Sequence, residues 1–239
     1  VQKRLMPNRD LSNYPIFGLN IPAREISGDF YDFYLHDDQV YFTLSDVSGK
    51  GVNAGMVMAK AITLFKIFAK QKFKPNEILL EMNNDLKETN PPGTFITSIV
   101  GSYNLKTDIV EISNAGHQPS ILRKGDIFQE FPSSSTPLAV IKQKNLESYK
   151  LETFKLDGGR VYCFTDGFSE CLDENKNEIG IKGVKELIKK HKNPSLKKEL
   201  ENATEEIRQK SLKKDYKEKG IKENNDILDD DLTIIGIGK

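Results

Sequence analysis

The sequence has few cysteines, no tryptophan and no net charge. Among its 239 residues, 35 Lys and Arg balance 35 Asp and Glu, which argues against a nucleic-acid-binding surface or a basic membrane-attachment surface. The two cysteines, Cys163 and Cys171, have neither the spacing of a zinc site nor a secretory context, so we expect a reduced, cytoplasmic protein. No apolar run approaches the roughly 18 residues of a membrane span, and no signal peptide is evident.

The length indicates one domain with a sizeable core. The first residue is Val1 rather than methionine, so we expect an upstream part of the protein to precede this sequence. Charge is uneven along the chain, because residues 182–223 contain fourteen Lys and Arg against eight Asp and Glu. Such a run is more often a solvated helical face than a binding patch.

Apolar periodicity predicts an α+β fold. Alternation and short apolar runs predict strands over 16–22, 40–45, 94–103, 109–114, 120–123, 127–131, 148–154, 160–165 and 232–237. Apolar residues spaced by three and four predict helices over 52–70, 75–88, 181–191 and 196–213, with Met58 in the core and a mobile loop over 213–225. This order indicates two packed antiparallel β-sheets, a β-sandwich, flanked by pairs of antiparallel helices.

Acidic residues occur at the edges of apolar segments in four separate places. They are Ser-Gly-Asp-Phe-Tyr-Asp at 27–32, Asp46 after the strand over 40–45, Thr-Asp-Gly at 165–167 and Asp-Asp-Asp-Leu-Thr at 229–233. Taken alone, Asp46 followed by Gly49 and Gly51 is equally well an ordinary strand-to-helix turn with a solvated carboxylate. Together, four strand ends could gather carboxylates that repel one another, and one or more hard divalent cations would balance that charge.

Oxygen ligands of this kind suit Mg²⁺ or Mn²⁺, whereas zinc is disfavoured because the sequence has no cluster of His and Cys. Asp37 and Asp38 fit a hairpin turn better than a metal site. His117 is a candidate for acid chemistry near neutral pH. We favour instead a turn over 114–117 that is closed by hydrogen bonds from side chains to the backbone, as Asn commonly makes.

Five motifs follow one another along the chain. They are Gly-Asp-Phe-Tyr-Asp at 28–32, Asp-Val-Ser-Gly-Lys-Gly at 46–51, Asn-Ala-Gly-His-Gln-Pro at 114–119, Thr-Asp-Gly at 165–167 and Asp-Asp-Leu-Thr at 230–233. In this order they resemble the metal-dependent serine/threonine phosphatases of the PPM (PP2C-like) superfamily, in the bacterial branch of SpoIIE and RsbU. One departure is Ser27, which stands where the family usually has a glycine and removes no expected ligand.

The resemblance implies the residues of a two-metal site. Asp46 would bridge two Mn²⁺ or Mg²⁺ ions, the Val47 carbonyl would complete one of them, and Asp166 and Asp230 would bind the other. Asp29 would act through metal-bound water, which makes Asp29 and Asp46 the expected catalytic residues, and a third ion is left open. Hydroxide generated by the two ions would attack phosphorus in line, without a covalent phosphoenzyme.

The resemblance also implies partners. The expected substrate is phosphoserine or phosphothreonine on a STAS-domain anti-sigma-factor antagonist. The loop over 89–94 and the basic, flexible segment over 213–225 are candidates for recognising that partner, although a merely soluble loop is the favoured interpretation of the segment over 213–225. Residues 1–12 would end a linker from an upstream sensor domain, and residues 13–239 would form the phosphatase domain.

Homodimerisation is left open, and no contact with nucleic acid or membrane is expected. The alternative is a catalytically silent PP2C-like interaction module, against which the intact acids argue, and a third interpretation is a structural cation site without turnover. Only a rate measurement separates the cation site from the enzyme.

Overall fold

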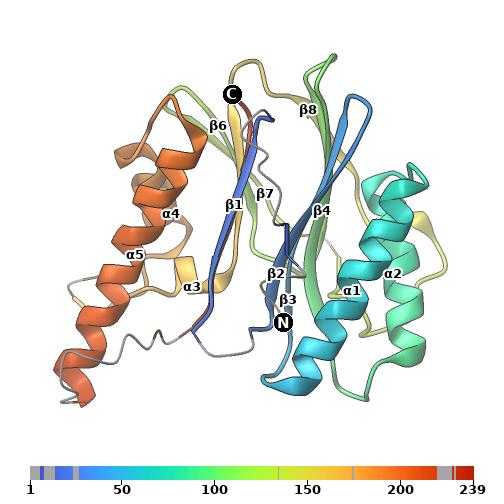
Figure 1. Cartoon of the computed structure of the whole chain (residues 1–239), viewed down its shortest axis with the longest axis horizontal. Helices are drawn as coiled ribbons and strands as arrows, with labels where there is room; N and C mark the ends of the chain where they lie inside the picture. Colours follow the sequence, from blue (N-terminus) through green and yellow to red (C-terminus); the bar gives the residue numbers. More distant parts are fainter. Residues whose placement is uncertain are drawn as a thin grey trace.

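The structure is a computed structural model. It describes residues 6–7, 14–23, 27–133, 135–173, 175–219, 228 and 230–239, and for residues 212–219 it describes the backbone alone. Two five-stranded antiparallel sheets pack face to face, and a pair of helices covers the outer face of each (Figure 1). The α+β sandwich that the sequence predicts is therefore confirmed. Three apolar layers hold it together, one between the sheets and one beneath each helix pair.

The first sheet, which we call sheet B, contains the strand that ends at the acidic motif. Its strand order is β2 (Asp29–His36), β3 (Gln39–Val47), β4 (Ile96–Asn104), β5 (Ile109–Ala115) and β8 (Glu152–Lys155). Strand β3 is buried on both faces, because sheet A covers one face and helix α1 (Val52–Lys70) covers the other. The predicted strand over 148–154 is shorter, since Leu146–Ser148 forms a turn of 3₁₀ helix.

The second sheet, sheet A, has the strand order β1 (Ile16–Ile21), β10 (Leu232–Ile237), β9 (Arg160–Phe164), β6 (Ser120–Lys124) and β7 (Ile127–Phe131). The chain passes from sheet B to sheet A between β5 and β6, at residues 116–119. Strand β5 pairs with β4 and β6 pairs with β9, so two strands that follow each other along the chain lie in different sheets. A positive φ of 69° at Gly116 allows the sharp change of direction.

Helices α1 (Val52–Lys70) and α2 (Pro75–Thr89) pack on sheet B, and α4 (Gly180–Lys190) and α5 (Leu196–Lys219) pack on sheet A (Figure 1). By length and apolar composition alone α1 could cross a membrane. Here it is a core helix, whose Met58 and Phe65 are buried as the sequence predicted for Met58. Helix α5 extends through 213–219, where a loop was expected, because Lys and Glu are good helix formers even without apolar neighbours. Residues 220–225 of that expected loop lie outside the described residues.

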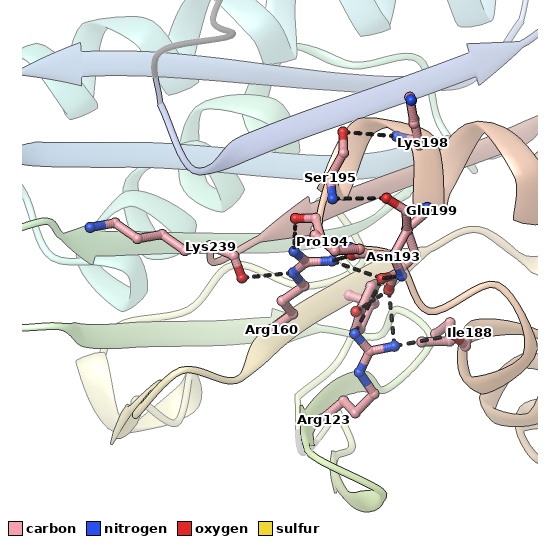
Figure 2. A network of polar contacts seen from close by, with 10 residues as sticks. Arg123, Arg160, Ile188, Asn193, Pro194, Ser195, Lys198, Glu199 and Lys239 are labelled. Atoms are coloured by element: carbon pink, nitrogen blue, oxygen red, sulfur yellow. Dashed lines mark hydrogen bonds and ion pairs between the residues drawn. The ribbon is translucent and has the colours of Figure 1, made fainter.

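A buried ionic network fixes α5 to sheet A. Arg123 of β6 and Arg160 of β9 converge on Glu199 of α5, with nitrogen–oxygen distances of 3.0 and 2.7 Å (Figure 2). All three side chains are nearly inaccessible, and Tyr162 also donates a hydrogen bond to Glu199. Because removing one partner of such a network would leave buried charge uncompensated, it holds the helix pair in one position against the sheet.

Candidate active site

The acidic segments that the sequence singled out meet at one end of the sandwich, where β3 leads into α1 and where α3 (Asp166–Ser169) lies (Figure 1). Asp29 is the first residue of β2, and its Cα pairs with that of Asp46 in β3. Asp46 lies inside β3, one residue before its end, and not beyond the strand as expected. Asp166 follows β9, and Asp230 precedes β10, the strand that pairs with β9. The fold thus brings the four predicted carboxylates to one place.

Asp29 spans the two sheets. It is 3% exposed, and its Oδ2 accepts hydrogen bonds from the hydroxyl groups of Thr165 (2.6 Å) and Thr233 (2.8 Å) on sheet A. Burial and the nearby charge of Asp46 raise the pKa of Asp29 well above its usual value, and the two threonine hydroxyls only partly oppose this. Without a cation, Asp29 therefore retains its proton more readily than an ordinary aspartate.

Asp46 is half-buried at the centre of the group. Burial, followed by the charges of Asp166 and Asp230, raises the pKa of Asp46 to about 6, whereas a hydrogen bond with Asp29 lowers it. The charges that shift the pKa of Asp46 are all those of carboxylates, so a bound cation would be electrostatically favourable at this site.

Asp166 is the first residue of α3 and is also half-buried. Burial and Asp230 raise its pKa, while hydrogen bonds from backbone N–H groups, including that of Gly167, favour its ionised form. A Cβ atom at Gly167 would lie only 2.2 Å from the carbonyl oxygen of Asp231. Glycine is therefore required where the start of α3 passes the segment that carries Asp230.

A second glycine brings the ends of β2 and β3 together. A Cβ atom at Gly28 would lie 2.7 Å from the carbonyl oxygen of Val47 and 3.1 Å from Oδ1 of Asp46. The Val47 N–H donates to the Gly28 carbonyl at 3.3 Å. The Val47 carbonyl, predicted as a metal ligand, thus lies beside the acidic group.

Asp231 is a member of the site that sequence reasoning missed. Its two carboxylate oxygens accept hydrogen bonds from the Ala23 N–H and from the Ser27 hydroxyl, which also accepts from the Asp29 N–H at 3.0 Å. The residue that departs from the family pattern, Ser27, therefore ties the loop before β2 to the segment before β10. Because residues 229–231 are three consecutive aspartates, the sequence gave no indication of which one would accept these hydrogen bonds.

The two threonines that bind Asp29 were also missed, although Thr165 directly precedes Asp166 and Thr233 ends the motif that contains Asp230. Asp32, in contrast, is not part of the site. It lies three residues from Asp29 in β2 and thus on the opposite face, where Lys66 of α1 pairs with it at 2.8 Å. Asp37 adopts the positive φ of a hairpin turn, as predicted.

The donor set fits a hard divalent cation, because it consists of carboxylates and a backbone carbonyl. Within the described residues, no three or more His, Cys, Asp and Glu side chains are oriented so that they could bind one metal ion together. Holding an ion would therefore require these carboxylates to rotate toward it. Their raised pKa values show that the site is electrostatically unfavourable without a cation.

Residues 36–238 match the family described as Stage II sporulation protein E (SpoIIE). The chain is 24% identical over 189 residues to Phosphoserine phosphatase RsbU of Bacillus subtilis (strain 168) and 25% identical over 219 residues to Protein IcfG of Synechocystis sp.. The alignments cover 78% and 79% of this chain but 56% and 34% of the relatives. The chain therefore spans about half of the one relative and a third of the other.

Several solved structures have the same fold. The SiaA-PP2C domain of Pseudomonas aeruginosa has a TM-score of 0.82 at 19% identity, covering 100% of this chain and 92% of that one. The PP2C phosphatase domain of SpoIIE from Bacillus subtilis has a TM-score of 0.75 at 18% identity, covering 95% and 64%. RsbX in complex with magnesium has a TM-score of 0.65 at 18% identity, covering 94% of each chain.

Proposed function

The chain belongs to the SpoIIE family of PP2C-like serine phosphatases, and from this premise we propose that it is a metal-dependent hydrolase of phosphoserine or phosphothreonine on proteins. The observation that carries the proposal is the meeting of four carboxylates, from four separate segments, at one end of the sandwich. Mutual repulsion and burial raise the pKa of three of them, as expected of a site built for cations.

In this proposal Asp46, Asp166 and Asp230 hold two Mn²⁺ or Mg²⁺ ions together with the Val47 carbonyl. When bound, the ions would supply Lewis acidity that activates water and neutralises charge on the phosphoryl oxygens. Asp29, fixed by two threonine hydroxyls, orients the attacking water. The water oxygen forms the new bond to phosphorus and the ester P–O bond breaks, while the proton given up by the water passes to the departing serine or threonine oxygen.

The chain should release phosphate from a generic aryl phosphate such as p-nitrophenyl phosphate when Mn²⁺ is present. EDTA should abolish the release and added Mn²⁺ should restore it, because the carboxylates alone cannot activate water near neutral pH. Release that persists in EDTA would contradict the proposal. Mn²⁺ binding without any release would favour the silent module or the structural cation site.

We further propose that the substrate is presented on a small folded protein, a STAS-domain anti-sigma-factor antagonist. An exposed apolar rim supports a protein substrate. The Ser48 N–H donates to the Phe95 carbonyl, and the Phe95 N–H donates to the Ser48 hydroxyl. Ser48 lies two residues after Asp46 in the sequence, and Phe95 is 39% exposed. Val52 and Met56, at the start of α1, are 66% and 68% exposed. Apolar side chains beside an acidic centre offer contact area to a protein surface that a free phosphate ester cannot use.

A phosphorylated STAS protein should therefore be hydrolysed with a higher kcat/KM than its short phosphopeptide. Phe95→Ala should lower kcat/KM for the protein about 10-fold and leave the peptide unchanged, since only the folded partner reaches the rim. Ile127→Ala is the matched control, because Ile127 is 76% exposed in the distant β6–β7 hairpin. Equal kcat/KM for protein and peptide would show that the folded partner is not recognised.

Regulation by an upstream sensor, dimerisation, residues 1–12 as the end of a linker and a cytoplasmic location stay predictions. So does recognition of the partner by the loop over 89–94 and the segment over 213–225, of which residues 220–225 lie outside the described residues. We retain them as proposals on the strength of the family alone.

A further inference from the structure

His117 is a buried titratable residue that the proposed reaction does not use. It lies where the chain crosses from sheet B to sheet A, and it is 7% exposed. The Asn114 side chain accepts a hydrogen bond from the His117 N–H at 2.8 Å and donates to the Gln118 carbonyl at 3.0 Å. The turn predicted from the sequence is thus confirmed for Asn114. It fixes the backbone of His117 but does not explain why an imidazole is buried there.

The imidazole extends a polar row on the inner face of sheet B. Asp29, Asp46 and Thr97 are register partners in β2, β3 and β4, so their side chains lie on one face in one row. Nδ1 of His117 lies 2.7 Å from Oγ1 of Thr97, at the end of this row. His117 therefore contacts the residue directly beside Asp46.

The other side of the ring faces sheet A. The Phe164 backbone raises the pKa of His117 as a carbonyl acceptor would, but burial outweighs it and lowers the pKa to about 4. Nε2 is buried and forms no hydrogen bond within the described part of the chain. In a neutral ring with its proton on Nε2, Nδ1 accepts from the Thr97 hydroxyl and Nε2–H is directed toward the Phe164 backbone.

Two cross-sheet connections thus flank Asp46. On one side Asp29 accepts a hydrogen bond from the Thr165 hydroxyl, and on the other His117 contacts Thr97 of sheet B and faces the Phe164 backbone of sheet A. Phe164 ends β9, and Thr165 directly precedes Asp166. Both contacts therefore lie at the end of β9 that leads into Asp166.

We propose that His117 is a positioning residue of the acidic site, whose imidazole holds the Thr97 end of β4 against the end of β9 and so keeps Asp46 and Asp166 at ion-binding distance. This inference rests on the proposed function, because it concerns the affinity of the same site for divalent cations. A merely structural histidine would contribute to stability and leave the cation affinity of the folded chain unchanged.

The test measures Mn²⁺ binding without substrate, from the electron paramagnetic resonance signal of free Mn²⁺, at a temperature where every variant is folded by circular dichroism. His117→Ala should weaken binding by about 10-fold, the lower end of the range for residues that orient metal ligands. Thr97→Val, which removes only the hydroxyl, should weaken it similarly. The double variant should be no weaker than either single variant, since both break one connection.

His117→Asn should recover part of the affinity, because its amide can occupy the place of Nδ1 beside Thr97. His191→Ala is the control, since His191 pairs with Glu206 between α4 and α5, away from the sheet interior. Wild-type affinity in both His117→Ala and Thr97→Val, or additive losses in the double variant, would overturn the inference while leaving the proposed function intact. A wild-type chain that neither binds Mn²⁺ nor releases phosphate would overturn both.

Discussion

Replacing Asp46 by asparagine should lower Mn²⁺-dependent phosphate release by ~10²-fold or more, and it should also stabilise the metal-free fold. The loss of activity follows because Asp46 is the central carboxylate of the group and would contact both ions. The gain in stability follows because three other carboxylates lie close to a half-buried charge. An amide of the same shape keeps the hydrogen bond with Asp29 and removes the repulsion.

The sign of the pH dependence distinguishes this effect from ordinary destabilisation. The pKa of Asp46 is raised from 3.8 to about 6 in the folded chain, so the folded state binds a proton more tightly than the unfolded state. The electrostatic cost is therefore present in full above pH 6 and is relieved as the pH falls toward 4. In EDTA at pH 7.5 we expect Asp46→Asn to raise the free energy of unfolding by about 1 to 2 kcal/mol, after a discount for partial exposure. The gain should shrink by pH 5.

Urea unfolding in EDTA at the two pH values measures the stability difference, and aryl phosphate release measures the activity. Asp126→Asn is the matched control, because it makes the same chemical change at an exposed turn between β6 and β7. It should alter neither quantity. Saturating Mn²⁺ should reverse the stability order, since wild type alone gains the full binding free energy. A metal-free Asp46→Asn chain that is less stable than wild type at pH 7.5 would contradict the electrostatic account.

Periodicity was sufficient to predict the helices on sheet B. Helix α1 covers the predicted range 52–70, and α2 ends one residue beyond the predicted range. These helices are amphipathic, so their apolar faces repeat in the sequence with the period of the structure. The exchange of strands between sheets at 116–119 could not be predicted in this way. Strands β5 and β6 have ordinary strand patterns, and only three-dimensional pairing decides that they belong to different sheets.

The site was predictable to the extent that its chemistry lies in single residues. Asp29, Asp46, Asp166 and Asp230 stand at the edges of strands, and the fold brings them together. The residues that orient them were not predictable, because their roles depend on packing across the sandwich. Thr233 is 204 residues away from Asp29 in the sequence, and Ser27 is equally far from Asp231. Asp32 also stands in an acidic motif but lies outside the site. It comes three residues after Asp29 in β2, so its side chain points to the face of the sheet that α1 covers.

Substituting Gly167 by alanine should lower phosphate release by ~10²-fold without removing any carboxylate, which would be the strongest evidence that the spacing of the acids matters. The new Cβ atom would lie 2.2 Å from the carbonyl oxygen of Asp231 and 3.1 Å from a Leu232 methyl group. Because no real Cβ contact is that short, the backbone at Asp231 must move by most of an ångström. The displacement would separate Asp230 from Asp166 and pull on the hydrogen bonds that hold Asp231 to Ser27 and Ala23.

Overpacking of this kind also costs stability, about 1 to 3 kcal/mol, so the measurement must separate displacement from unfolding. Gly125→Ala is the control, since an alanine there meets open space and strains only a turn whose φ is 61°, far from the acids. Both variants should lose stability in urea, but only Gly167→Ala should lose kcat and Mn²⁺ affinity when assayed well below its unfolding midpoint. Wild-type kcat and Mn²⁺ affinity in folded Gly167→Ala would mean that the site tolerates the displacement. In that case the close passage of α3 past Asp231 would serve packing alone.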